Sequence, residues 1–165
     1  MAYPLQPLLS VRSFREDNAK AAVSAAEAAL RQAEDAAEKS RAELERYQQW
    51  LPEEKERRYA GIMGKLMSLA DLDSFKAGLS LLDDGVLTRE DAVQQAEKIV
   101  EERRNKLRAA QLALTSARKE KMKIDMHKDI WSQEAAKEAE RAAELEMEDF
   151  TPGIVLQQHG HKEED

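Results

Sequence analysis

The chain has 165 residues, of which 36% are charged and only 5% aromatic, and its net charge is −7. This composition is typical of long helices or coiled coils rather than compact globules. The absence of Cys excludes disulfides and thiolate chemistry, and the negative charge argues against nonspecific nucleic-acid binding. No apolar run approaches the roughly 18 residues that span a bilayer, and no secretory signal pattern opens the chain. We therefore expect a helical protein that binds no nucleic acid and inserts into no membrane.

Residues 1–7 predict a short extended lead, because prolines 4 and 7 disfavour helix in the residues before them. A long helix should follow, with no Gly or Pro before Pro52. Its apolar and small residues recur every seven positions in two series, offset by three, as the a and d positions of a coiled coil do. The series are Val23, Leu30, Ala37, Leu44 and Leu51, and Ala19, Ala26, Ala33, Ser40 and Tyr47. Pro52 predicts a bend or a restart of this helix, which we expect to resume through residue 69.

Residues 61–87 differ in composition, because they are rich in Leu and Met and contain several Gly. We expect a short helix over 73–82, capped by Asp71 or Asp73, and a turn at Asp83-Asp84-Gly85. Such a segment is too apolar for a bare loop. It predicts a small helical head at residues 70–87, where the chain reverses.

The stretch from Thr88 to Phe150 contains no Gly and no Pro, and it opens with a pattern like a capping box, Thr88-Arg-Glu-Asp91. It predicts a second long helix with its own heptads. One series is Val93, Val100, Leu107 and Leu114, and the other is Ala96, Ala110, Ala117, Ile124, Trp131 and Leu145. Lys121 and Lys128 interrupt the first series, so we expect the seam to loosen near Lys121.

Two arms of nearly equal length, 8–69 and 88–150, predict an all-α fold: a long antiparallel two-helix coiled-coil hairpin with a small helical head at the turn. Paired residue numbers should then sum to about 158, so that Leu44 faces Leu114. A self-associated parallel dimer is the alternative that the heptads also allow. Thr151-Pro152-Gly153 should end the second arm, leaving residues 151–165 as a disordered tail.

The sequence holds no constellation of catalytic residues, so we expect no enzyme, no metal and no cofactor. His127 lies near Asp129, Trp131 and Glu134, but one helix face offers too few ligands for a metal. We interpret it as a partly exposed helical His.

Two groups of side chains remain candidates for contacts with partners. Tyr47 and Leu51 fit the seam, whereas Trp50 lies beside it, and exposed aromatic side chains often anchor partners. Met63 and Met67 are adaptable packing residues, which favours the core of the head, although a binding role stays open.

Two stretches carry a resemblance to a known family. They are Tyr3-Pro-Leu-Gln-Pro-Leu-Leu-Ser-Val-Arg12 and the segment KMKIDMHKDIWSQEAAKEAE around His127 and Trp131. The chain resembles the YscO family of type III secretion proteins, whose flagellar relative is FliJ. The resemblance implies a non-enzymatic central stalk that inserts into a hexameric secretion ATPase and couples it to the export gate. It also implies a bacterial protein at the cytoplasmic face of the secretion apparatus, and possible contacts with export chaperones.

This resemblance, together with the apolar character of both ends, assigns two sets of contact residues. The ATPase would contact Leu5, Leu8, Leu9, Val11, Arg12, Arg15, His127, Trp131 and Glu134. The gate or the chaperones would contact Tyr47, Trp50, Leu51, Met63 and Met67. The first alternative is a soluble escort that binds and recycles export chaperones. A generic coiled-coil scaffold fits the periodicity equally well, and only the terminal motifs argue against it.

Overall fold

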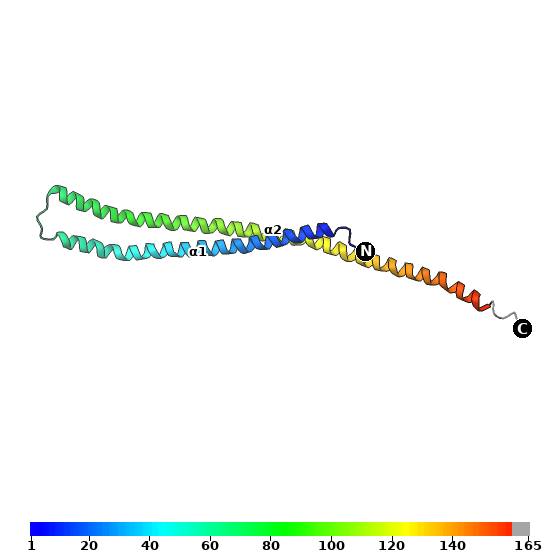
Figure 1. Ribbon diagram of the computed structural model, residues 1–165. Helices are drawn as coiled ribbons and strands as arrows, with labels where there is room; N and C mark the ends of the chain where they lie inside the picture. Colours follow the sequence, from blue (N-terminus) through cyan, green and yellow to red (C-terminus); the bar gives the residue numbers. More distant parts are fainter. Residues whose placement is uncertain (160–165) are drawn as a thin grey trace. The chain divides into compact units, whose positions relative to one another are not determined.

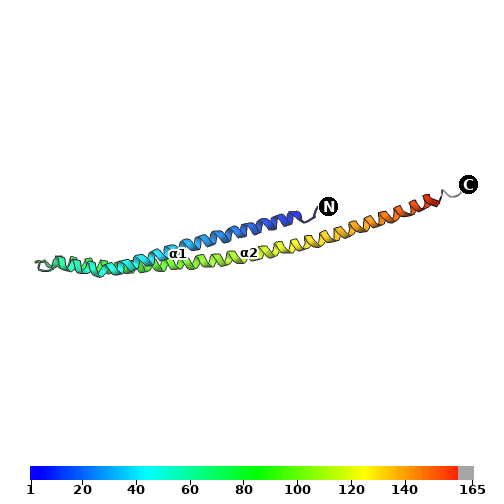
Figure 2. The ribbon, with the colours of Figure 1, turned by 90° about the horizontal axis from the view of Figure 1, so that it is seen from below.

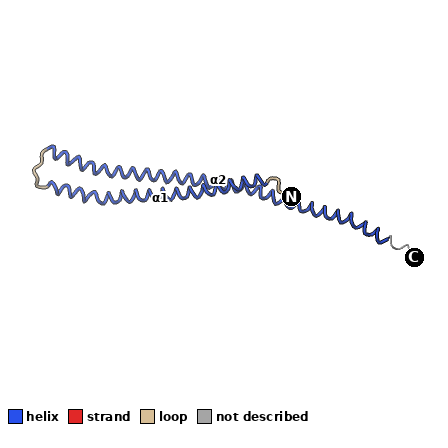
Figure 3. Tube along the Cα trace, in the orientation of Figure 1, coloured by secondary structure: helices blue, strands red, loops and turns tan. Residues whose placement is uncertain are grey.

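A computed structural model describes the backbone of residues 1–159 and the side chains of residues 1–150. It contains two helices, α1 at Gln6–Ile62 and α2 at Leu69–His159 (Figure 1). The remaining described backbone is a short lead before α1 and a loop between the helices (Figure 3). The helices pack against each other and no strand occurs in the described chain, which confirms the predicted two-helix hairpin.

The chain divides into two compact units. We call residues 1–18 and 115–159 the terminal unit, and residues 19–114 the turn unit. Each contains a segment of both helices and a small apolar core of its own.

The chain reverses at residues 63–68, within the turn unit. Gly64 has a φ of 75°, a conformation that other residues rarely adopt, and the amide of Lys65 donates to the carbonyl of Ile62 at 3.2 Å. Ser68 and Asp71 then form a reciprocal capping box: each side chain accepts from the other residue's amide, at 3.1 and 3.3 Å. These contacts start α2 at Leu69.

The predicted head at residues 70–87 is therefore wrong, because this segment belongs to α2. Its apolar residues extend the heptads of the second arm backwards. Leu79 and Val86 precede Val93 in one series, and Phe75 and Leu82 precede the other; all four are half-buried. The apolar composition is thus a continuation of the seam.

The heptads predicted for α1 are confirmed. All ten positions are buried or half-buried, while most of the residues between them are exposed. Ala33 and Ala37 form the core of the turn unit with Val100, and Leu30 and Ala96 pack against it. Small side chains at the contact let the two backbones approach closely.

The predicted pairing register is wrong. Glu34 pairs with Arg104 at 3.9 Å, and Arg41 with Glu97 at 3.3 Å, so paired numbers sum to about 138 rather than 158. The terminal unit agrees, since Glu16 lies 3.5 Å from Lys121. Leu44 therefore does not face Leu114. The cause is the position of the turn, which comes earlier in the chain than the predicted head.

The helix α1 continues through Pro52 to Ile62, so the predicted restart does not occur. A proline removes only one backbone hydrogen bond from the helix. Side-chain contacts continue on its C-terminal side: Glu54 pairs with Arg57 at 2.6 Å and with Arg58 at 3.2 Å.

The seam of α2 keeps its spacing where we expected it to loosen, because Lys121 and Lys128 are both half-buried at heptad positions. Among residues 1–150, the last half-buried one is Ala135, and every side chain from 136 to 150 is exposed. Leu145, predicted for the seam, is 62% exposed because no segment of α1 lies beside it. In two views this part of α2 runs on alone (Figures 1 and 2).

The second helix also passes through Thr151-Pro152-Gly153 and ends at His159. The predicted disordered tail is therefore wrong for residues 151–159. As at Pro52, the proline removes one hydrogen bond without ending the helix. The rest of that predicted tail, residues 160–165, lies outside the described residues.

Candidate interaction surfaces

Tyr3 anchors the N-terminal lead to α2 in the terminal unit. Its side chain is only 6% exposed and packs with Leu9, Ile124 and Trp131. The rings of Tyr3 and Trp131 meet edge to face, with centroids 5.4 Å apart. The Tyr3 hydroxyl shares a 2.6 Å hydrogen bond with Nδ1 of His127. His127, expected to be a partly exposed helical His and a contact for the ATPase, thus also holds Tyr3 against α2.

Charged side chains connect α1 to α2 further along the terminal unit, after the contacts of Tyr3. The Arg12 guanidinium donates to the backbone carbonyl of Glu120 at 2.7 Å, and Arg15 lies 4.0 Å from the Glu120 carboxylate. Glu16 is buried at 8% exposure between Lys121, at 3.5 Å, and Arg118, at 4.0 Å. Arg12 and Arg15 therefore hold α1 to α2.

The residues predicted to contact the ATPase all lie in the terminal unit, but they differ in exposure. Leu9 belongs to the core, and Trp131 is half-buried against it. Leu5, Leu8, Val11 and Glu134 are exposed.

Besides Met1, Met147 and Phe150, sequence reasoning missed four exposed apolar side chains in this unit. Together with three predicted ones they form what we call the terminal apolar surface: Leu5, Leu8, Val11, Phe14, Met122, Met126 and Ile130. Met122, Met126 and Ile130 follow one another at intervals of four, so they share one face of α2. That face lies away from the seam residues Ile124 and Lys121. The spacing of four residues between Met122, Met126 and Ile130, outside the heptad series, was the sequence signal that could have identified these exposed side chains.

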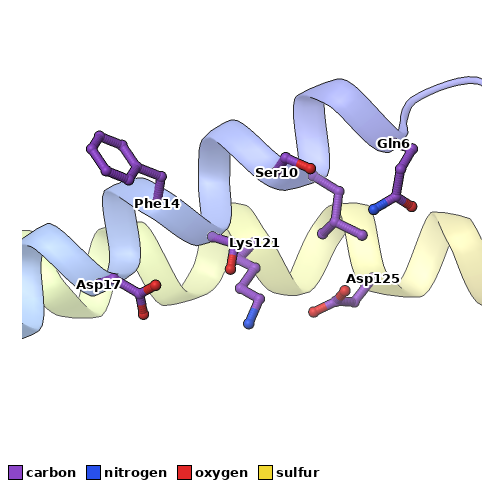
Figure 4. A pocket seen from close by; sticks show the side chains of 8 residues that line it. Gln6, Ser10, Phe14, Asp17, Lys121 and Asp125 are labelled. Carbon is purple, nitrogen blue, oxygen red and sulfur yellow. The ribbon is translucent and has the colours of Figure 1, made fainter.

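An open groove runs along the terminal unit, on one side of the seam. Its labelled lining residues are Gln6, Ser10, Phe14, Asp17, Lys121 and Asp125 (Figure 4). Lys121 lies between the two carboxylates along the groove, and Phe14 points outwards from α1 (Figure 4). Six of its eight lining residues are polar or charged, and Leu9 and Phe14 are the apolar members.

In the turn unit, Tyr47 is the centre of a second aromatic cluster. Its hydroxyl donates to the carbonyl of Leu82 at 2.6 Å, and the Arg89 guanidinium lies 3.8 Å above its ring. Trp50, whose ring centroid is 5.3 Å from that of Tyr47, is 38% exposed. Leu51 is half-buried in the seam. The predicted division between seam residues and an outlying Trp50 therefore agrees with the structure.

Gly85 explains how Tyr47 reaches the backbone of α2. A Cβ atom at this position would collide with the Tyr47 hydroxyl and lie 2.7 Å from its Cζ. The sequence suggested a turn here, whereas Gly85 lies inside α2 and makes room for a ring. A glycine within a helical pattern can mark such a close approach.

The two methionines do not form the core of a head. Met63 is 79% exposed at the turn and Met67 is half-buried. We define the turn apolar surface as the exposed set around them: Tyr59, Met63, Leu66, Leu69 and Leu72. Tyr59 also packs edge to face on Phe75, with centroids 5.3 Å apart.

Within the described part of the chain, no cluster of three or more His, Cys, Asp or Glu side chains could hold a metal ion. In the same residues, no helix has an apolar stretch long enough to cross a membrane.

Two long antiparallel helices, joined by a tight turn and paired through small side chains, define a coiled-coil hairpin protein. The chain belongs to the YscO family of type III secretion proteins, which matches residues 5–152. This finding confirms the family suggested by the terminal motifs.

Two solved structures are similar. One is the type III secretion protein YscO from Vibrio parahaemolyticus, with a TM-score of 0.81 and 25% identity over 88% of this chain and 92% of that chain. The other is a proposed YscO homologue from Chlamydia trachomatis, with a TM-score of 0.74 and 24% identity over 99% of both chains. The similarity to the structure from Chlamydia trachomatis supports the fold alone. The comparison with curated protein sequences gives no match.

Proposed function

We propose that this protein is the central stalk of a type III secretion ATPase, inserting into the hexamer and coupling it to the export gate. One observation supports the proposal: α1 bears exposed large apolar side chains near both of its ends, and it exposes none from residue 15 to 49, a fully described stretch. On α2, Leu81, Leu87, Ile99 and Leu112 are also exposed, outside the terminal and turn apolar surfaces.

The terminal apolar surface includes the outer faces of both helices, as expected for a rod that its partner encloses. Val11 and Phe14 lie away from the seam on α1, and Met126 lies away from it on α2. A partner on one side would cover only one of these faces. Exposed apolar groups on both outer faces fit a partner that surrounds the helix pair, such as a ring. The terminal unit is therefore the segment that we assign to the ATPase.

The turn apolar surface is the candidate contact for the export gate. Met63 and Leu66 lie at a tight reversal and are almost fully exposed. Trp50, with its exposed edge, is the further candidate in the same unit. Methionine and aromatic side chains adapt to partner surfaces and are enriched at interfaces.

The test compares two variants that leave the seam intact. Leu9 and Arg12 are unsuitable, because both hold α1 to α2. We would therefore combine Val11→Ser with Met126→Ser in the terminal variant, and Met63→Ser with Leu66→Ser in the turn variant. A control variant carries Leu112→Ser, an exposed position outside both surfaces.

The measurements are stimulation of the purified secretion ATPase and binding to the cytoplasmic domain of the gate. We expect the terminal variant to lose stimulation and keep gate binding, and the turn variant to do the reverse. The control should match the wild type in both. Loss of ATPase stimulation in the turn variant alone would overturn the assignment of the surfaces. A wild-type protein that binds export chaperones and leaves the ATPase rate unchanged would instead favour the escort role.

A further inference from the structure

Charged residues interrupt the apolar seam in the terminal unit. Counting back seven residues from Ala19 and from Val23 gives Arg12 and Glu16, and counting forward seven from Leu114 gives Lys121. All three are buried or half-buried, as heptad residues should be. A carboxylate as buried as Glu16 is costly unless an opposite charge lies beside it.

Antiparallel pairing supplies those opposite charges. Across the seam, Glu16 meets Lys121 at 3.5 Å and Arg118 at 4.0 Å. Arg12 is also satisfied, because it donates to the Glu120 carbonyl. This part of the hairpin therefore places the buried carboxylate beside opposite charges.

Parallel pairing of two copies would have the opposite effect. In an in-register parallel coiled coil, each a or d residue faces the same residue of the other chain. Glu16 would then face a second Glu16, and Lys121 a second Lys121. Like charges brought together in this way disfavour an arrangement by electrostatic repulsion.

We propose that Glu16 and Lys121 select the intramolecular antiparallel hairpin and reject parallel self-association. Other charged seam residues, such as Arg103 and Lys128, would add to the same repulsion in a parallel dimer, but the apolar and small seam residues do not discriminate in this way. Ala33, Ala37 and Leu44, for example, have heptad spacing that suits parallel and antiparallel pairing alike. Glu16 and Lys121 thus determine which pairing of the helices forms, and this effect does not depend on any secretion partner.

The test replaces the charged pair with apolar residues that fit a seam. Glu16→Leu combined with Lys121→Leu keeps the heptads, so the variant should fold. A single nitroxide at Arg31, an exposed position, reports only distances between chains. We expect the wild type to be a monomer without an interchain distance. The variant should form a dimer, and its equal labels should lie within the range of pulsed electron paramagnetic resonance, because parallel chains align equal residues.

Two comparisons complete the test. Glu27→Leu with Lys119→Leu makes the same changes at exposed positions, and this control should stay monomeric. Glu16→Lys should lower the melting temperature, because it brings a third cation beside Arg118 and Lys121, and adding Lys121→Glu should restore part of the loss. A double-leucine variant that stays monomeric, or that dimerises without a short interchain distance, would overturn the proposal. So would a Glu16→Lys variant that melts like the wild type.

Discussion

The ring of Tyr47 lies against the backbone of Gly85, in the space that a larger side chain at position 85 would fill. The Tyr47 hydroxyl donates to Leu82 on one side, and Arg89 covers the ring. This contact joins α1 to α2 at one defined level of the turn unit.

Gly85→Ala should therefore destabilise the protein, even though Ala favours helix over Gly by about 1 kcal/mol. The new Cβ would lie 2.7 Å from Cζ of Tyr47, so the ring must move, and we expect a net loss of about 1–2 kcal/mol. Urea unfolding followed by circular dichroism measures it. The matched control is Gly61→Ala, where no atom lies within 4 Å of the new Cβ and the helix should gain stability. If the free energy of unfolding rises by a similar amount in both variants, the Tyr47 contact is unimportant for stability.

Leu44→Asp should lower the free energy of unfolding far more than Glu45→Ala. Leu44 is half-buried at a heptad position of α1, whereas its neighbour Glu45 is exposed. We expect a loss of about 1–3 kcal/mol for the first change and less than about 0.5 kcal/mol for the second. Thermal melts of the two variants provide the comparison, and equal melting temperatures would contradict the assigned seam.

The pairing register can be measured with spin labels in place of Arg41 and Glu97. These exposed residues form an ion pair at 3.3 Å, so the labels should be close within one chain. Labels at Glu45 and Ala113, whose numbers sum to 158, should be far apart. Position 113 lies about 30 Å along α2 from the residue opposite Glu45, at 1.5 Å per residue. The reverse pattern of distances would restore the register that we expected from the sequence.

Tyr3→Ala should free the start of α1 from α2. Trp131 reports this change, because its ring packs edge to face on Tyr3. In a Trp50→Phe background, Trp131 is the remaining tryptophan, and its emission should shift to longer wavelength as water reaches it. Tyr3→Phe should shift it less, since only the hydrogen bond to His127 is lost. Unchanged emission in the Ala variant would mean that Tyr3 does not cover Trp131.

Pro52→Ala should stabilise α1. The proline lies inside a continuous helix, where it removes a backbone hydrogen bond and costs up to about 3 kcal/mol relative to Ala. Chemical unfolding should show a higher midpoint for the variant. A lower midpoint would indicate that the helix depends on the proline at this site.

Periodicity predicted the seam of this hairpin well. The seven-residue spacing of α1 depends only on which residues share a helix face, and positions such as Ala33 and Ala37 are buried as expected. Pairing between arms is a different property, because it depends on where the chain turns. The start of the second helix after the turn could be marked by either of two similar capping patterns, Ser68-x-x-Asp71 or Thr88-x-x-Asp91. The structure uses the first, and the hydroxyl of Thr88 instead donates to the carbonyl of Asp84 within α2.

The remaining errors come from residues whose local preference is overridden by packing. Gly85 normally favours a turn, but here it is needed because Tyr47 approaches α2. Pro52 normally interrupts a helix, but α1 continues across it. For the candidate surfaces, Leu8 and Val11 are exposed, whereas Leu9 is buried. Extending the heptads would have predicted the burial of Leu9, which lies fourteen residues before Val23, and the exposure of Met126, which lies outside both series.

The stretch of α2 from residue 136 to 150, where every side chain is exposed, has a thermodynamic consequence. A lone helix of this length gains no free energy from a seam, and isolated helices shorter than about 12–15 residues are marginal in water. Its helical content should fall gradually on warming, before the paired segments melt cooperatively. Heating curves of ellipticity should then have a sloping pre-transition baseline, and the enthalpy inferred from their steepness should be smaller than the heat measured by calorimetry.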